Sequence, residues 1–144
     1  MDFSALLAAT KTIAVVGMSN RPERPSYAVA SVMQDGGYRI IPVNPQYAGT
    51  LILGECCVAS LADIKVPVDI VDCFRRSEDM VGVAVEAVAM MPMPKVLWMQ
   101  LGVANDNAAK IACDAGMDVV QNRCLETTFL ALNPKRNISH ANSI

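Results

Sequence analysis

Arginine residues recur at the ends of apolar segments of this chain, where their side chains could hold an anionic ligand. Five of the 12 basic residues follow such segments: Arg21, Arg24, Arg75, Arg76 and Arg123. A guanidinium group donates through a planar fork to phosphate oxygens, and the N-terminus of a helix adds free N–H groups and a favourable dipole. Because the formal net charge is −2, these arginines do not reflect a general excess of basic residues. They indicate an anion site, although exposed loops also collect arginines without any ligand.

Short β-branched runs alternate with longer helical patterns, and these elements must position the arginines. Strands are predicted at residues 12–17, 38–44, 68–74, 95–100 and 117–122, with a short extra strand after residue 45. Helices are predicted at residues 27–35, 78–91, 105–115 and 124–132, and a single helical turn at residues 60–64. The predicted N-caps are Ser26, Ser60 and Ser77. The predicted inner face of the second helix contains Val81, Ala84, Val85 and Val88.

This alternation predicts an α/β fold, a single Rossmann-like, doubly wound parallel sheet of about five strands with helices on both faces. At 144 residues the chain fits one domain, which we assign to residues 1–132, followed by a polar tail at residues 133–144. Ligands bind such a sheet at the carboxyl ends of its strands, where the strand order reverses. All five arginines are expected at that edge.

The first loop differs from the phosphate loops of dinucleotide-binding and Walker proteins. Its sequence, VVGMSNRPERPSY, carries one early glycine, Gly17, where close approach to a pyrophosphate usually uses more. The second strand ends in VNP, so Asn44 stands where NAD-binding folds carry the acidic residue that binds a ribose. These features disfavour NAD, and an NAD(P)-binding oxidoreductase or a redox-sensing protein remains the alternative function.

Seven segments between about Lys11 and Cys124 can be compared, in their order along the chain, with the motifs of known families. They are VVGMSNRPERPSY, GYRIIPVNPQYAG, LGE, SLADI, VDIVDCFRRSE, VLWMQLGV and AGMDVVQNRC. Together they resemble the motifs of small stand-alone CoA-binding proteins, which are similar to the N-terminal CoA-binding domain of the succinyl-CoA synthetase α subunit. In one departure, family members often carry Glu-His shortly after the last cysteine, whereas Thr127 and Thr128 occupy that region here.

The resemblance implies binding of CoA or an acyl-CoA along the carboxyl edge of the sheet. The phosphates would lie at the first loop and the adenosine beside the PVNP and FRR segments. The rest of the ligand would follow the WMQLG segment towards the end of the fifth strand. The residues implied are Gly17, Ser19, Asn20, Arg24, Ser26, Tyr27, Asn44, Pro45, Tyr47, Phe74, Arg75, Arg76, Gln100, Gly102, Asn122, Arg123 and Cys124.

The sequence shows no evident catalytic constellation, so binding without turnover is the leading expectation. The only histidine, His140, lies in the polar tail, which leaves no Ser–His or Cys–His pair and no histidine-based metal site. Cys124 is the one candidate reactive thiol, because Arg123 and a helix N-terminus would favour its thiolate. The alternative is a small buried hydrophobic residue. Asp72 is expected to be buried and hydrogen-bonded in a structural role.

Composition and charge argue against several other classes of protein. The net charge of −2 gives no basic surface for nucleic acid, and the most apolar stretch, MVGVAVEAVAMM, is too short to span a membrane and contains Glu86. The start, MDFSALLAAT, lacks the basic segment of a signal peptide, and the five cysteines form no C-x-x-C pair. A cytoplasmic protein with reduced thiols is expected. Besides CoA, its candidate partners are a second copy of the chain or a separate acyltransferase or synthetase chain.

Overall fold

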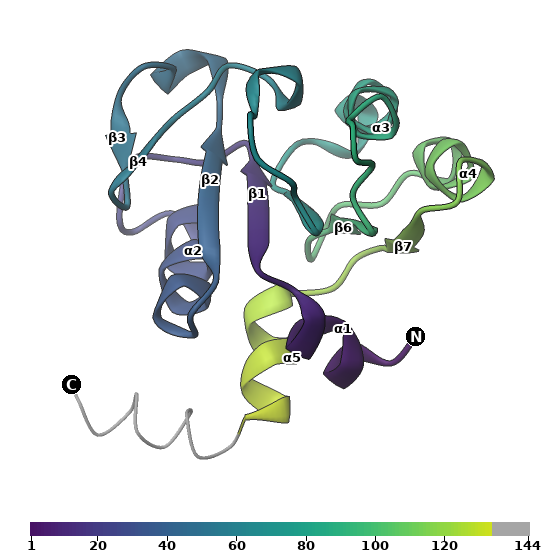
Figure 1. Cartoon of the computed structure of the whole chain (residues 1–144), viewed down its shortest axis with the longest axis horizontal. Coiled ribbons are helices and arrows are strands. Elements are labelled where there is room, and N and C mark those ends of the chain that lie inside the picture. The colour runs from purple at the N-terminus through teal and green to yellow at the C-terminus, as the bar shows by residue number, and fades with distance from the viewer. Residues whose placement is uncertain (134–144) are drawn as a thin grey trace.

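The computed structural model describes residues 1–133, which form a five-stranded parallel sheet covered by helices (Figure 1). Neighbouring strands are parallel throughout, in the order β2-β1-β5-β6-β7. They are β1 (Thr12–Val16), β2 (Arg39–Val43), β5 (Ile70–Cys73), β6 (Val96–Met99) and β7 (Asp118–Val120). Each lies within a range predicted from the sequence, which confirms the α/β fold. Apart from Asn133, the predicted tail lies outside the described residues.

Helices cover both faces of the sheet (Figure 1). One face carries α1 (Phe3–Ala9), α2 (Pro25–Asp35) and α5 (Leu125–Leu132), and the other carries α3 (Met80–Val88) and α4 (Asp106–Asp114). The two-turn helix α1 was not predicted; its N-cap is Asp2, whose carboxylate accepts a hydrogen bond from the Ala5 N–H at 3.0 Å. No helix among the described residues is long and apolar enough to cross a membrane.

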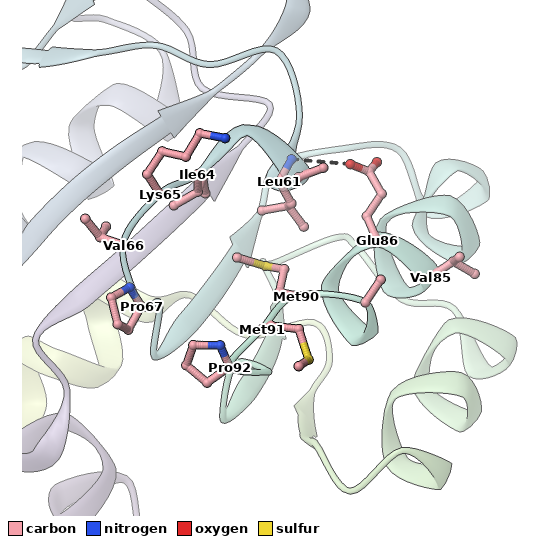
Figure 2. Close-up of a pocket in the computed structure, with 12 residues that line it drawn as sticks. Leu61, Ile64, Lys65, Val66, Pro67, Val85, Glu86, Met90, Met91 and Pro92 are labelled. Carbon is pink, nitrogen blue, oxygen red and sulfur yellow. Dashed lines mark hydrogen bonds between the residues drawn. The ribbon is translucent and has the colours of Figure 1, made fainter.

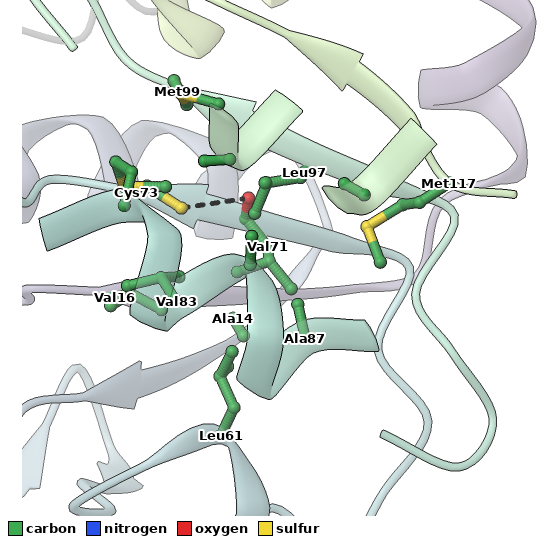
Figure 3. Close-up of a cluster of buried hydrophobic side chains, with 14 of the residues drawn as sticks. Ala14, Val16, Leu61, Val71, Cys73, Val83, Ala87, Leu97, Met99 and Met117 are labelled. Carbon is green, nitrogen blue, oxygen red and sulfur yellow. Dashed lines mark hydrogen bonds between the residues drawn. The ribbon is translucent and has the colours of Figure 1, made fainter. Parts of the chain in front are cut away.

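Small side chains let α3 and α4 lie close together over the sheet. Four alanines of these helices are completely buried: Ala84, Ala87, Ala108 and Ala112. Figure 3 shows this core, in which Val71 of β5 faces Ala87 of α3. Burying an alanine costs no side-chain rotamer entropy, and its small volume lets neighbouring helices approach, so this face of the sheet is tightly covered.

The buried face of α3 differs from the predicted one. Two of the four predicted positions, Val81 and Val85, are exposed, whereas Ala84 and Val88 contribute to the core as predicted. Met80 is completely buried instead. Because α3 is apolar on nearly all sides, hydrophobic periodicity did not define which face turns inward.

Two predicted N-caps are wrong. The hydroxyls of both serines accept hydrogen bonds from backbone N–H groups of loops instead of from the first turn of a helix. Ser26 lies inside the first turn of α2, whose N-cap is Arg24, and its hydroxyl accepts a hydrogen bond from the Ser19 N–H at 2.9 Å. Ser77 begins a short 3-10 turn, η3 (Ser77–Asp79), and its hydroxyl accepts from the Ala104 N–H at 3.1 Å. Ser77 thus joins loops that lie far apart in the sequence, whereas Ser26 fastens the loop that directly precedes α2.

The connection from β2 to β5 contains little helix, as predicted. Two 3-10 turns flank an antiparallel hairpin: η1 (Pro45–Tyr47), β3 (Leu51–Ile52), β4 (Glu55–Cys56) and η2 (Leu61–Asp63). Ser60 caps η2 as predicted, and its N–H donates to Oδ2 of Asp63 at 3.2 Å. Because η1 directly follows β2, it lies at the carboxyl edge of the sheet.

Trp98 of β6, the single tryptophan of the chain, occupies the core under α1 and α5. It is completely buried, and its ring centroid lies 5.4 Å from that of Phe3. Its indole N–H donates to the carbonyl of Arg123 at 2.7 Å. This hydrogen bond joins β6 to the segment that follows β7.

Candidate ligand-binding site

The strand order reverses between β1 and β5, and a single glycine allows their ends to meet there. Gly17 follows β1 with a φ of +83°, and a Cβ at this position would lie 2.4 Å from the carbonyl oxygen of Phe74. Its N–H donates to the Val43 carbonyl of β2 at 2.9 Å. Gly17 therefore brings the ends of β1, β2 and β5 together at the position where open α/β sheets bind ligands.

A largely polar pocket of about 500 Å³ opens at this point. Its lining combines the first loop, the start of α2, the segment after β2 and the end of β5: Gly17, Ser19, Arg21, Arg24, Pro25, Ser26, Asn44, Gln46, Tyr47 and Phe74. Most of these residues were predicted from the sequence, and the structure brings them into one cavity. Gln46 was not predicted, and only its position two residues after Asn44 could have suggested it.

Internal hydrogen bonds fix the shape of the first loop. The Ser19 hydroxyl accepts from the Arg21 N–H at 3.1 Å, while the Ser19 N–H donates to the buried Ser26 hydroxyl. Asn20 and the two loop arginines remain exposed. The serines therefore hold the backbone in place, and the long cationic side chains are left to face the pocket.

Asn44 uses both ends of its amide within the protein. Its Nδ2 donates to the Met18 carbonyl at 2.9 Å, and its Oδ1 accepts from the Gln46 N–H at 2.9 Å. Pro45 then begins η1, and Tyr47 packs against the core beside it. Asn44 thus couples the loop after β2 to the loop after β1, and it offers no carboxylate to a ribose.

The four arginines near the pocket differ in their partners. Within the described part of the chain, the guanidinium groups of Arg21 and Arg24 form no ion pair or hydrogen bond. Arg75 instead pairs with Asp79 at 3.5 Å, and Arg76 pairs with the same carboxylate at 3.3 Å. The uncompensated positive charge of the pocket therefore comes from the first loop.

Gln100 and Asp72 are buried below the surface of the carboxyl edge and do not line the pocket. Gln100 is buried, and its Nε2 donates to Oδ2 of Asp72 at 3.3 Å while its Oε1 accepts from the Leu125 N–H at 3.1 Å. Among the described residues, the other oxygen of Asp72 has no hydrogen-bond partner. Complete burial raises the pKa of the Asp72 carboxyl well above its usual range, against the opposing effect of the Gln100 hydrogen bond. Asp72 is buried and hydrogen-bonded, as predicted.

The last predicted residues lie at a second hollow, at the ends of β6 and β7. This groove of about 370 Å³ is mainly apolar and is lined by Phe3, Leu101, Asn122, Arg123, Cys124, Thr127, Thr128, Ala131 and Leu132. The Arg123 guanidinium lies 4.4 Å from the centroid of the Phe3 ring and donates to the Thr128 hydroxyl at 3.0 Å. Arg123 is thus engaged within the protein and is absent from the lining of the first pocket.

Backbone contacts shape the rim between the two hollows. The Gly102 N–H donates to the Asn122 side chain at 2.7 Å, which ties the loop after β6 to the loop after β7. Cys124 is half-buried and forms the N-cap of α5. Ten of the residues predicted for one continuous ligand therefore lie in two separate hollows along one edge, seven in the polar pocket and three in the apolar groove. The others line neither hollow: Asn20, Tyr27, Pro45, Arg75, Arg76, Gln100 and Gly102.

The described residues contain no group of three or more His, Cys, Asp or Glu side chains that could hold a metal ion. His140 lies outside the described residues. The arrangement provides donors, cations and apolar walls, which suit the binding of an anionic nucleotide.

Comparison with known proteins identifies the family. A family model described as a CoA binding domain matches residues 11–129. The chain belongs to this family. It is 42% identical over 125 residues to the uncharacterized protein YneT of Bacillus subtilis (strain 168), covering 87% of this chain and 90% of YneT. The resemblance found in the sequence is confirmed.

Solved structures share the fold. The protein cell-free ID.343 from Thermus thermophilus superposes with a TM-score of 0.87 at 38% identity, covering 91% of this chain and 96% of the other. A dinucleotide-forming acetyl-coenzyme A synthetase 1 of Ca. Korarchaeum cryptofilum has a TM-score of 0.62 at 22% identity, over 76% of this chain and 25% of the synthetase. This second likeness shows the fold alone, which also serves as one part of a much larger enzyme.

Proposed function

We propose that this chain binds CoA or an acyl-CoA at the carboxyl edge of its sheet and does not turn it over. The observation that carries the proposal is the polar pocket at the β1/β5 reversal, where two unpaired arginines meet the start of α2 in a member of the CoA-binding domain family. CoA carries more phosphate charge than NAD, and the lining of this pocket holds two arginines and, among the described residues, no carboxylate.

We expect each part of the ligand to contact a different surface along this edge. Arg21, Arg24 and the N–H groups at the start of α2 would hold phosphate oxygens. Tyr47 and Phe74 supply aromatic surface for the adenine. The pantetheine arm would then cross the ends of β5 and β6 towards the apolar groove, which would receive an acyl group.

The route to that groove crosses three strand spacings, from β1 to β7, or about 14 Å. The exposed loop containing Gly102 lies on this route, whereas Gln100 and Asn44 act by positioning the loops. We also propose a cytoplasmic location, where the free thiols of all five cysteines would remain reduced.

Thermal denaturation with and without ligand tests this function. CoA is expected to raise the melting temperature, because a ligand at about 100 times its Kd stabilises the folded state by about 2.7 kcal/mol. NAD at the same concentration serves as the matched control and is expected to have little effect. Mass spectrometry of small molecules released from the purified protein should identify CoA or an acyl-CoA. No shift with CoA, or release of NAD(H), would contradict the proposal.

A further inference from the structure

A third hollow lies away from the proposed CoA site, between η2 and the end of α3. Its volume is about 630 Å³, and Figure 2 shows Leu61, Ile64, Met90 and Pro92 around it. Its lining also includes Pro67, which precedes β5, and Pro92 precedes β6. The part of the hollow formed by Pro67 and Pro92 therefore lies towards the amino ends of the strands, whereas the ligand pocket opens at their carboxyl ends.

The surface around this hollow is unusually apolar for a solvent-facing helix. Val81 and Val85 lie one turn apart on the outer side of α3 and are 36% and 54% exposed. Met91, which follows the helix, is 95% exposed. The inner side of α3 is apolar as well, and a helix that is hydrophobic all round is normally buried. Methionine is also enriched at the centres of protein interfaces.

The lining of the hollow carries one residue of each charge. Lys65 and Glu86 are the only charged residues of its lining, and Figure 2 shows them on either side of Leu61. Lys65 has no ion pair within the described residues, and Glu86 accepts one weak hydrogen bond, from the Leu61 N–H at 3.3 Å. One unpaired cation and one nearly free anion at the same surface make that surface self-complementary.

We propose that this hollow is the interface of a two-fold symmetric homodimer. A two-fold axis places the same surface of both copies face to face, so Lys65 of each copy would meet Glu86 of the other. The projecting Met91 of one copy would enter the hollow of the other. No residue that lines the proposed ligand pocket also lines this hollow, so both ligand pockets of the dimer would remain open.

Analytical ultracentrifugation across protein concentrations tests the proposal. The expected mass is about twice the 15.4 kDa of the chain. The variants Met91→Asp and Val85→Glu should each weaken self-association by about tenfold or more, because they place charge at the centre of the interface. Leu51→Asp is the matched control, since Leu51 is 74% exposed on the β3–β4 hairpin and should leave the mass unchanged. Circular dichroism confirms that each variant is folded.

Charge reversal tests the symmetry of the pairing. Lys65→Glu and Glu86→Lys should each weaken the dimer about threefold or more, whereas an equimolar mixture of the two variants should recover it, because every pair across the interface is then opposite in sign. A wild-type chain that stays monomeric up to about 1 mM, a dimer insensitive to Met91→Asp, or a mixture that does not recover would each overturn the proposal. Since CoA binding is measured separately, failure here leaves the ligand site untouched.

Discussion

Two loops at the carboxyl edge each carry a pair of arginines, and they use this charge differently. In the loop after β1, Arg21 and Arg24 have no acidic partner among the described residues. In the loop after β5, Arg75 and Arg76 share the carboxylate of Asp79. Position at the edge is therefore insufficient to predict availability: Asp79 pairs with both arginines of its loop, whereas Glu23, between Arg21 and Arg24, forms no ion pair with either among the described residues. Exposed ion pairs contribute little, about 0–1 kcal/mol, so the second pair can still exchange its partner for a phosphate.

The largest effect is expected from a substitution that forces the loop after β1 away from the loop after β5. Gly17→Ala is expected to cost about 3 kcal/mol of unfolding free energy, since it adds a left-handed backbone penalty to a clash with the Phe74 carbonyl. Gly54→Ala is the matched control: Gly54 has a φ of +79° but open space around it, so about 1–2 kcal/mol is expected. Urea denaturation measures both. Equal losses would show that the close approach to Phe74 is unimportant.

The second prediction compares one arginine from each loop. Arg24→Ala should weaken CoA binding by about tenfold to a hundredfold, because it removes an unpaired charged donor. Arg76→Ala should change the affinity by less than about threefold, since this exposed arginine is already paired. Isothermal titration calorimetry gives both values, with melting temperatures close to wild type. A larger loss of CoA affinity for Arg76→Ala than for Arg24→Ala would place the phosphates at the loop after β5 instead of the loop after β1.

The third prediction concerns Asp72, which lies just before the β5 loop. Because burial raises its pKa, the folded protein holds the proton more tightly than the unfolded chain. This stabilisation is complete below the unfolded pKa and is lost as pH rises through the folded pKa. Asp72→Asn removes the titration, so its melting temperature relative to wild type should improve by a few degrees between about pH 5 and about pH 8. A difference that stays constant with pH would exclude a buried, protonated Asp72.

The smallest effect is expected from freeing Arg75 in the loop after β5. Asp79→Asn removes the acidic partner of Arg75, while Arg76 keeps its ion pair with Glu78 at 3.6 Å, and should strengthen CoA binding about threefold at low salt. Glu55→Gln, which breaks the exposed pair with Arg39 elsewhere, is the control and should have no effect. Weaker binding after Asp79→Asn would mean that this carboxylate positions the arginines.

The sequence predicted the sheet well, because buried parallel strands produce apolar runs that few other structures share. The strand order, and with it the position of the reversal between β1 and β5, was not predicted. The meeting of Gly17, Asn44 and Phe74 at one edge followed from expecting parallel strands. The inward face of α3 was mispredicted, since Val81 and Val85 are as apolar as the residues that the helix buries.

Side-chain partners were less predictable than elements. Ser26 and Ser77 match the pattern of an N-cap, but N–H groups seven and 27 residues away bind their hydroxyls. Gln100 was assigned to the ligand from its position, yet its amide joins Asp72 to α5. Such hydrogen bonds depend on tertiary geometry, and no local pattern specifies them.

The hydrogen bond between Trp98 and the Arg123 carbonyl also makes the intrinsic fluorescence of Trp98 a probe of this region. A single, completely buried indole gives one fluorescence signal, free of overlap from other tryptophans, that shifts to longer wavelength when water reaches the ring. Because its N–H touches the backbone at the end of the proposed ligand path, the emission should respond to occupancy of the apolar groove as well as to unfolding. Unlabelled protein can therefore report both events in one titration.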